Sequence, residues 1–324
     1  MDKAKALKGA DIVIKNWLEV KSCDNLLIVT DKPHREEGML LKDVSEHIGC
    51  ETDIMITEKE GKLVGMYFDS HPDVFNGYDY IIGATDYSLI TTVAAKTAIK
   101  NGSSFLSLPL HTNDGRSMLE YDFLSCDTDK SKKLAEALTE KLQNAGVIHV
   151  TTTRGTDLYF YKKNRHAKFF NGKVKDCGGY SSASIEVYIP IEESRTHGCL
   201  VLDGSYGYIG KVETPFQILF SGGKITSVED SPDGNKLQNF LDDYCDEKMF
   251  TASEFGIGLN PLSRCNGNCY IEDESSLGTF HIGLGRNLAL GGVWEASGHF
   301  DLTTHKPDVY ADGFKIIHNG QIIV

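Results

Sequence analysis

Short apolar runs alternate with longer amphipathic stretches in the first half of the chain. The runs are rich in aliphatic residues, as buried strands are, and they lie at residues 26–30, 53–57, 80–83, 105–108 and 146–150. Between them, residues 40–48, 88–100 and 130–144 show the spacing of amphipathic helices. This alternation predicts an α/β domain over residues 1–155, in which an open parallel sheet, with the run at 146–150 as its last strand, is flanked by helices.

The pattern changes beyond about residue 155. Glycine becomes frequent, short apolar segments follow one another, and helical spacing persists mainly at residues 235–246. Near the end of the chain, Asn319-Gly320 separates two apolar segments, which is the strongest short-range signal of a β-hairpin. Residues 156–324 are therefore predicted to form a second, mainly antiparallel β (α+β) domain.

Charge and composition restrict the kinds of partner. The 324 residues include 33 Lys and Arg against 46 Asp and Glu, a net charge of −13, and such a field repels the phosphates of nucleic acids. No stretch approaches the roughly 20 apolar residues of a membrane-spanning helix. The first residues lack the apolar core of a signal peptide, and eight cysteines are spread from Cys23 to Cys269. We therefore expect a cytoplasmic protein with reduced thiols that binds neither nucleic acid nor membrane.

Several familiar motifs are incomplete. Gly256-Ile257-Gly258 and Gly283-Leu284-Gly285 each lack the third glycine of a dinucleotide-binding fingerprint. Cys265 and Cys269 have no second pair of cysteines nearby to complete a four-ligand zinc site. We interpret this cysteine pair as two thiols flanking a turn.

Histidines and carboxylates gather between Glu254 and Asp301. His299 and Asp301 are two residues apart, so on a strand both side chains point to one face and can bind one cation. Upstream lie His281 and an acidic triplet at 272–274. Taken singly, these residues also fit a core histidine, a solvated turn and a surface ion pair. Together, in a region rich in glycine, they favour a metal site.

The same region resembles a known family. Ala252-Ser253-Glu254-Phe255-Gly256-Ile257-Gly258, the triplet at 272–274 and the segments 277–285, 291–292, 299–301 and 307–313 look like the metal-binding half of the aminopeptidase T family, the family M29 metallopeptidases. Residues 185–190 and 198–205 resemble an upstream segment of that family. The resemblance covers about residues 180–313 and is only architectural before residue 150.

The resemblance implies a site for two divalent ions, which would be zinc, cobalt or manganese. Glu186, Glu254 and His281 would hold one ion, and Glu254, His299 and Asp301 the other, so that Glu254 bridges them. Glu274 would be a further ligand or the base that activates water. The implied activity is that of a metallo-aminopeptidase, a hydrolase that releases N-terminal amino acids from short peptides, and the implied assembly is a homodimer.

Two departures keep other functions open. Leu288 stands where the best-known aminopeptidases of the family carry a tyrosine, and Ile185 stands where the family usually has glycine. The fold also resembles the iron(II) dioxygenases that open 2,5-dihydroxypyridine, which keep a His-x-Asp pair like His299 and Asp301. Those enzymes have a histidine at the position of Glu254 and no counterpart of His281. The ligand identities therefore favour the hydrolase, with the dioxygenase and a non-catalytic relative as alternatives.

Overall fold

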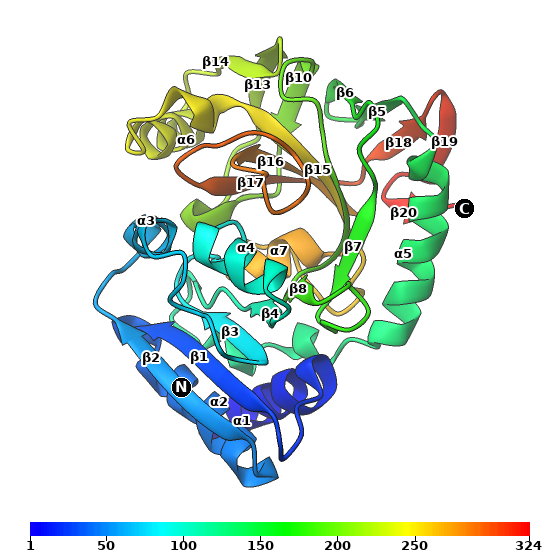
Figure 1. The fold of residues 1–324 in the computed structure, drawn as a ribbon. Helices are drawn as coiled ribbons and strands as arrows, with labels where there is room; N and C mark the ends of the chain where they lie inside the picture. Colours follow the sequence, from blue (N-terminus) through cyan, green and yellow to red (C-terminus); the bar gives the residue numbers. More distant parts are fainter. The chain divides into compact units, whose positions relative to one another are not determined.

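The computed structural model describes residues 1–324 as two compact units (Figure 1). The first unit contains residues 1–128 and 170–184, and the second contains residues 129–169 and 185–324. The first is built on a parallel sheet, and the second on two antiparallel sheets. The predicted fold class is confirmed.

The sheet of the first unit has the strand order β2-β1-β3-β4-β8, and all neighbours are parallel. Its strands are β1 (Asn25–Asp31), β2 (Glu51–Thr57), β3 (Tyr80–Ala84), β4 (Ser104–Ser107) and β8 (Tyr180–Ser182). The order reverses between β1 and β3, which is where doubly wound folds have their topological switch point.

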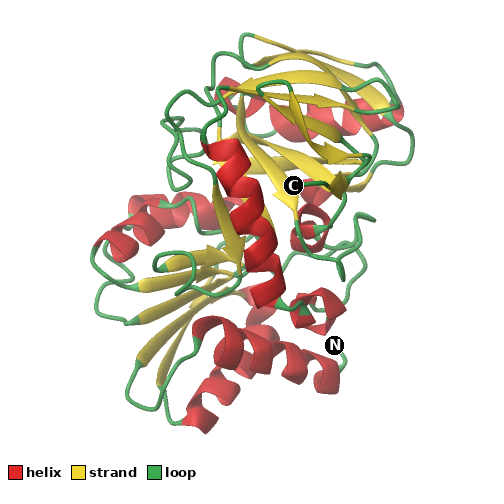
Figure 2. Ribbon diagram, turned by 90° about the vertical axis from the view of Figure 1, so that its right-hand side faces the viewer, coloured by secondary structure: helices red, strands yellow, loops and turns green.

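Helices cover both faces of this sheet (Figure 2). On one face, α1 (Lys3–Asp11) packs against α2 (Arg35–Ile48), and Gly38 of α2 approaches β1 so closely that a Cβ atom there would lie 2.8 Å from Cγ2 of Thr30. On the other face, α3 (Lys62–Ser70) and α4 (Val93–Lys100) bury residues such as Phe68 against Leu27. The predicted helix at 88–100 begins only at Val93, because Thr92 caps it by accepting a hydrogen bond from the Ala95 N–H.

The second unit consists of two large sheets. The eight-stranded sheet has the order β14-β13-β10-β6-β5-β18-β19-β20. These strands are β5 (Val147–Thr151), β6 (Asp157–Tyr161), β10 (His197–Leu202), β13 (Phe216–Ser221), β14 (Lys224–Val228), β18 (Asp308–Ala311), β19 (Phe314–His318) and β20 (Gln321–Ile322). The seven-stranded sheet has the order β12-β11-β17-β16-β15-β9-β7. Its strands are β7 (Lys168–Asn171), β9 (Ile185–Pro190), β11 (Ser205–Tyr206), β12 (Gly210–Lys211), β15 (Ala252–Gly258), β16 (Thr279–Gly285) and β17 (His299–His305).

Aromatic side chains join the two sheets. The ring of Phe160 on β6 lies 5.3 Å from that of Phe255 on β15, and Phe255 lies 6.2 Å from Phe280 on β16. The helices of this unit are α5 (Thr128–Gln143), α6 (Pro232–Asp242) and α7 (Tyr270–Ser275). The short helix α7 packs against β9, β15, β16 and β17, so the seven-stranded sheet is covered there on its other face.

Two predictions about strand pairing have different outcomes. The C-terminal hairpin is confirmed, since β19 and β20 are antiparallel across Asn319-Gly320, both with positive φ. The assignment of residues 146–150 to the parallel sheet is wrong, because β5 pairs antiparallel with β6 and β18. Its burial alternates along the strand, as in a sheet with one covered face. The fifth parallel strand is instead β8, which contains no apolar run.

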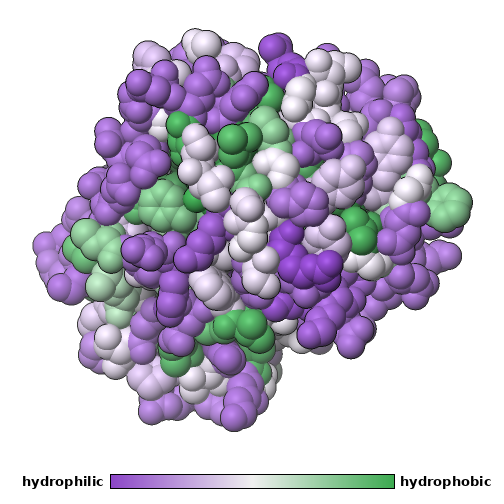
Figure 3. Space-filling view, turned by 90° about the horizontal axis from the view of Figure 1, so that it is seen from above, coloured by the Kyte–Doolittle hydropathy of each residue, from purple (hydrophilic) through white to green (hydrophobic).

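The surface is mainly hydrophilic on the face shown in Figure 3, where apolar areas are small and scattered. No helix combines the length and the apolar character that crossing a bilayer requires.

Candidate metal centre

Four neighbouring strands of the seven-stranded sheet carry the predicted metal ligands. Glu186 lies on β9, Glu254 on β15, His281 on β16, and both His299 and Asp301 lie on β17. Side chains alternate between the two faces of a strand, so Phe255 and Phe280 point into the core while their neighbours Glu254 and His281 point to the opposite face. The strand pairing therefore gathers residues separated by more than a hundred positions on one face of the sheet.

Glycines make room for these side chains. Every predicted ligand on these strands has a glycine as a cross-strand partner: Glu186 pairs with Gly258, Glu254 and Asp301 pair with Gly283, His281 pairs with Gly256, and His299 pairs with Gly285. A Cβ atom on Gly256 would lie 1.9 Å from Nε2 of His281, and one on Gly283 would lie 2.9 Å from Oε2 of Glu254. The two Gly-x-Gly motifs thus have a role in this site, where they leave space above the sheet for the ligand side chains.

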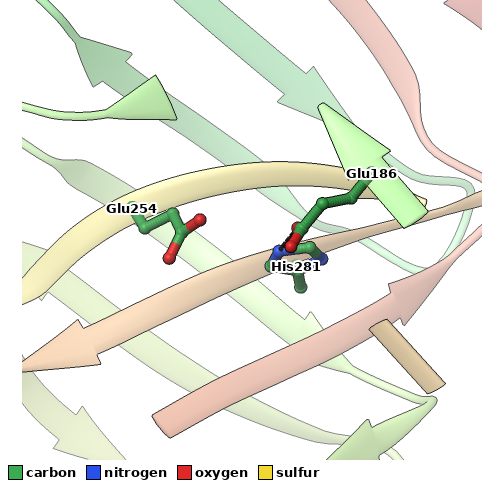
Figure 4. A group of neighbouring side chains, drawn as sticks. All are labelled: Glu186, Glu254 and His281. Atoms are coloured by element: carbon green, nitrogen blue, oxygen red, sulfur yellow. Dashed lines mark ion pairs between the residues drawn. The ribbon is translucent and has the colours of Figure 1, made fainter. Parts of the chain in front are cut away.

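The first group of potential ligands is Glu186, Glu254 and His281, whose donor atoms all lie within 4.8 Å of one another. Nε2 of His281 is 2.8 Å from Oε2 of Glu186, and Figure 4 shows this pair beside Glu254 of the neighbouring strand. All three side chains are buried, and Nδ1 of His281 has no hydrogen-bond partner.

The second group is Glu254, His299 and Asp301, whose donor atoms also lie within 4.8 Å of one another. Nε2 of His299 lies 3.0 Å from Oε2 of Glu254 and 3.4 Å from Oδ1 of Asp301. Nδ1 of His299 is 2.8 Å from the carbonyl oxygen of Arg286, to which it donates, so that Nε2 is the nitrogen left to bind an ion. Since Glu254 belongs to both groups, the two potential ion positions are adjacent.

Burial and mutual charge perturb these groups strongly. Burial raises the pKa of Glu254, and His299 offsets this only in part. For His281, burial opposes the charged form, but the neighbouring carboxylates Glu186, Asp301 and Glu254 outweigh it and raise the pKa to about 9. For Asp301 burial is likewise outweighed, here by His299, and the pKa is lowered. The buried carboxylates thus favour positive charge on the groups between them.

The residues fit a divalent transition metal. Imidazole and carboxylate donors suit iron, zinc and manganese, and the convergence of buried carboxylates is costly unless a cation compensates it. Oδ1 of Asp301 is buried and accepts no hydrogen bond, as expected for an oxygen directed at an ion. The donor atoms themselves therefore support metal binding at this site.

Helix α7 adds two further side chains to the site. Glu274 belongs to neither group of three ligands, but it forms a hydrogen bond with Asp301, and its burial among Glu186, Asp301 and Glu254 raises its pKa well above the usual value. Tyr270, four residues earlier and hence on the same side of the helix, donates its hydroxyl to Oδ2 of Asp301. Tyr270 is not among the residues predicted from the sequence, although its spacing of four from Glu274 is a signal that could have indicated it.

The rest of the acidic triplet and the cysteine pair are structural. Glu272 accepts a hydrogen bond from the Arg264 N–H, and Asp273 accepts hydrogen bonds from the N–H groups of Asn266 and Gly267. These carboxylates therefore hold the turn that contains Cys265. Burial raises the pKa of the Cys265 and Cys269 thiols well above the usual value, as expected for unreactive cysteines.

Comparison with known proteins identifies the family. The sequence model of NicX, 2,5-dihydroxypyridine 5,6-dioxygenase, matches residues 122–324, which include every residue of the metal centre. The chain belongs to this family. A curated 2,5-dihydroxypyridine 5,6-dioxygenase from Pseudomonas putida strain KT2440 is 22% identical over 214 residues, which are 60% of this chain and 59% of that protein.

Two solved structures share the fold of this member of the 2,5-dihydroxypyridine 5,6-dioxygenase family. The 2,5-dihydroxypyridine dioxygenase of Pseudomonas putida KT2440 superimposes with a TM-score of 0.79 at 16% identity, over 100% of this chain and 98% of that one. AmpT from Thermus thermophilus superimposes with a TM-score of 0.65 at 14% identity, over 100% of both chains. At such low identity these matches establish the fold alone.

The prediction of a metallo-aminopeptidase is wrong. The family that the chain matches and its curated relative are named for a dioxygenase, an oxidoreductase rather than a hydrolase or protease, which was the alternative interpretation. The resemblance to family M29 holds for the fold, as AmpT confirms. The error has a physical cause, because a buried face of carboxylates and histidines identifies a metal site without determining which reaction the metal supports.

Proposed function

We propose that this protein is a metal-dependent, ring-cleaving dioxygenase whose substrate is a dihydroxylated aromatic ring of the 2,5-dihydroxypyridine type. The observation that carries the proposal is that the dioxygenase family match extends over all the strands of the metal centre. The curated relative bears the same enzyme name, and the match spans 59% of its length.

Three residues would hold the working ion. Glu254, His299 and Asp301 are buried side by side, and the carbonyl of Arg286 orients His299. We propose ferrous iron here, because it can exchange electrons with dioxygen and zinc cannot. When bound, iron would supply a redox-active centre at which dioxygen and an electron-rich ring can react. The donors are one histidine and two carboxylates, so this site carries more negative charge than the two-histidine, one-carboxylate triad common in iron(II) oxygenases.

The adjacent group could hold a second divalent ion. Glu186 and His281 share Glu254 with the iron group, and both are buried. We propose a capacity of up to two ions per chain, to be determined by metal analysis of protein reconstituted with iron alone. A plateau at one ion would restrict binding to one of the two groups.

Glu274 is proposed as the acid–base group of the site. It lies next to Asp301 without belonging to either group of three ligands, so it can exchange a proton with the substrate or product while the ion stays bound. We expect Glu274→Gln to retain iron in metal analysis and to lose roughly 100-fold or more in turnover. Loss of iron together with turnover would instead assign Glu274 to the ligands.

The direct test is oxygen consumption. The protein is reconstituted with ferrous iron under anaerobic conditions, mixed with 2,5-dihydroxypyridine and air-saturated buffer, and followed by an oxygen electrode and by the loss of ring absorbance. We expect equimolar loss of oxygen and ring in the wild type and neither in His299→Ala, which removes a ligand. If the wild type binds iron but consumes no oxygen with this or any other dihydroxylated ring, the proposal is wrong.

A further inference from the structure

A buried tyrosine contacts the metal centre from outside the sheet. The side chain of Tyr270, the first residue of α7, is 4% exposed, and its hydroxyl donates a hydrogen bond to Oδ2 of Asp301. Its ring stacks on that of Tyr208, with the ring centroids 4.4 Å apart and an angle of 25° between the planes. Packing therefore holds the hydroxyl in place against the carboxylate.

The two carboxylate oxygens of Asp301 differ in their hydrogen bonding. Oδ2 accepts the hydroxyl of Tyr270, whereas Oδ1 accepts no hydrogen bond and lies 3.4 Å from Nε2 of His299. That nitrogen is itself directed by the bond from Nδ1 of His299 to the Arg286 carbonyl. His299 and Asp301 are thus each hydrogen-bonded to a partner outside the ligand group, and each keeps one donor atom available near Glu254.

We propose that Tyr270 is a positioning residue that makes Asp301 a one-oxygen ligand of the ion bound with Glu254 and His299. The inference rests on the metal-dependent function proposed above. Without the hydroxyl, Glu274 remains beside the carboxylate, but Oδ2 loses the partner that directs it away from the ion, so either oxygen or both can face the ion. Partners of this kind typically contribute a factor of about 10–100 to metal affinity.

The chain offers a matched control for this inference. Tyr206 lies in the same unit, is fully buried and donates its hydroxyl to Oδ1 of Asp233 at a distance of 2.7 Å. Asp233 belongs to neither group of metal ligands. Tyr206→Phe and Tyr270→Phe each remove one buried hydroxyl bonded to a carboxylate and keep the ring, so a general loss of stability should affect both.

The test is anaerobic titration of the metal-free protein with ferrous iron, and separately with cobalt(II), whose visible spectrum reports the ligand geometry. We expect Tyr270→Phe to weaken iron binding about 10–100-fold and to alter the cobalt spectrum, while Tyr206→Phe leaves both as in the wild type. In the background of Asp301→Ala, adding Tyr270→Phe should cause no further loss of affinity, because the residue through which the tyrosine acts is gone.

Three results would overturn the inference. Tyr270→Phe could bind iron as tightly as the wild type, or Tyr206→Phe could lose as much affinity, which would make the effect a matter of stability. Alternatively, oxidised iron-loaded wild type could show an intense visible phenolate-to-iron absorption that Tyr270→Phe lacks, which would make the tyrosine a direct ligand. The measurement needs no substrate, so it stands apart from the oxygen-consumption test, and a wild type that binds no metal would contradict the proposed function first.

Discussion

At the scale of single residues, the centre depends most on Glu254. This carboxylate is the one residue common to both groups of potential ligands, and it is buried against His299 with 3.0 Å between Oε2 and Nε2. Glu186 belongs only to the group that contains His281. Removing the negative charge at these two positions should therefore have unequal consequences.

We expect Glu254→Gln to weaken iron binding by more than about 100-fold, beyond the loss typical of an outer partner, because a ligand itself is changed. Glu186→Gln should retain an ion held by Glu254, His299 and Asp301. Metal analysis after dialysis against a weak chelator distinguishes the two variants, and circular dichroism verifies that both are folded. Equal retention by both variants would contradict the assignment of Glu254 as the shared ligand.

The residue scale also shows how far the sequence alone could lead. Glu186, Glu254, His281, His299 and Asp301 could be predicted, because their motifs are local and resemble a family, and the structure brings them together. The spacing of Tyr270 from Glu274 indicates one side of a helix, but the bond from Tyr270 to Asp301 depends on how that six-residue helix packs against the sheet, which the sequence does not show. The predicted reaction was wrong because ligand types identify a metal site but do not specify which substrate reacts there.

At the scale of elements, the site depends on strands that alternate ligands with glycines. Gly256 faces His281, and a Cβ atom there would lie 1.9 Å from the Nε2 atom of that histidine. A side chain of any size must push the imidazole out of the group formed with Glu186 and Glu254. The glycines of β15 and β16 are in this sense part of the metal centre.

Gly256→Ala should displace His281, destabilise the protein by about 1–3 kcal/mol and reduce the metal content. Gly65→Ala is the control, since Gly65 lies within α3, a Cβ atom added to it would have no neighbouring atom within 4 Å, and alanine favours a helix. Urea unfolding and metal analysis of both variants measure the two effects. Wild-type metal content in Gly256→Ala would contradict the proposed role of the glycine.

A second element-scale feature lies in the first unit, at the carboxyl ends of its parallel strands. His34 precedes α2 and lies between Asp86, 3.3 Å from its Nε2, and Glu37, 3.8 Å from its Nδ1. Burial opposes the charged imidazole, but its hydrogen bonds with these carboxylates prevail and raise the pKa to about 9. The ionic cluster therefore stabilises the first unit in a manner that depends on pH.

The direction of the His34 pKa shift determines how the stability of the folded protein changes with pH. Because the pKa rises from 6.5 to about 9 on folding, the stabilisation is complete below the lower value and is lost as the pH rises through the upper one. At about pH 6, His34→Gln should cost on the order of 3 kcal/mol, and at about pH 10 much less. Urea unfolding of His34→Gln and the wild type at both pH values measures this cost in stability. The control is His47→Gln, because His47 is exposed on the adjacent helix α2. A cost independent of pH would rule out the charged pair as its origin.

At the scale of the whole molecule, the fold class was predictable and one strand was not. Apolar runs reveal strands but not their partners, and so β5 was placed in the parallel sheet while the short, serine-containing β8 was overlooked. Pairing depends on contacts between residues far apart in the chain, such as Val309 with Val150, which no local pattern encodes.

Assembly is a further prediction at this scale. We propose a homodimer, as the resemblance to the aminopeptidase T fold implies, and Phe314 on the terminal hairpin, which is 79% exposed, is an apolar group that such a contact could cover. Light scattering at micromolar concentration should give twice the chain mass of 35.8 kDa. The mass of a single chain would refute the proposal.

The central claim, that this metal centre supports ring cleavage by dioxygen, is tested most directly by the origin of the oxygen atoms in the product. Iron-loaded protein is incubated with 2,5-dihydroxypyridine under isotopically labelled dioxygen in ordinary water, and the product is analysed by mass spectrometry. A dioxygenase breaks one carbon–carbon bond of the ring and transfers both atoms of one dioxygen molecule to the product, so we predict two labelled atoms in the ring-opened molecule. A product labelled only from water, or an unchanged ring with protein that has bound its iron, would contradict the account.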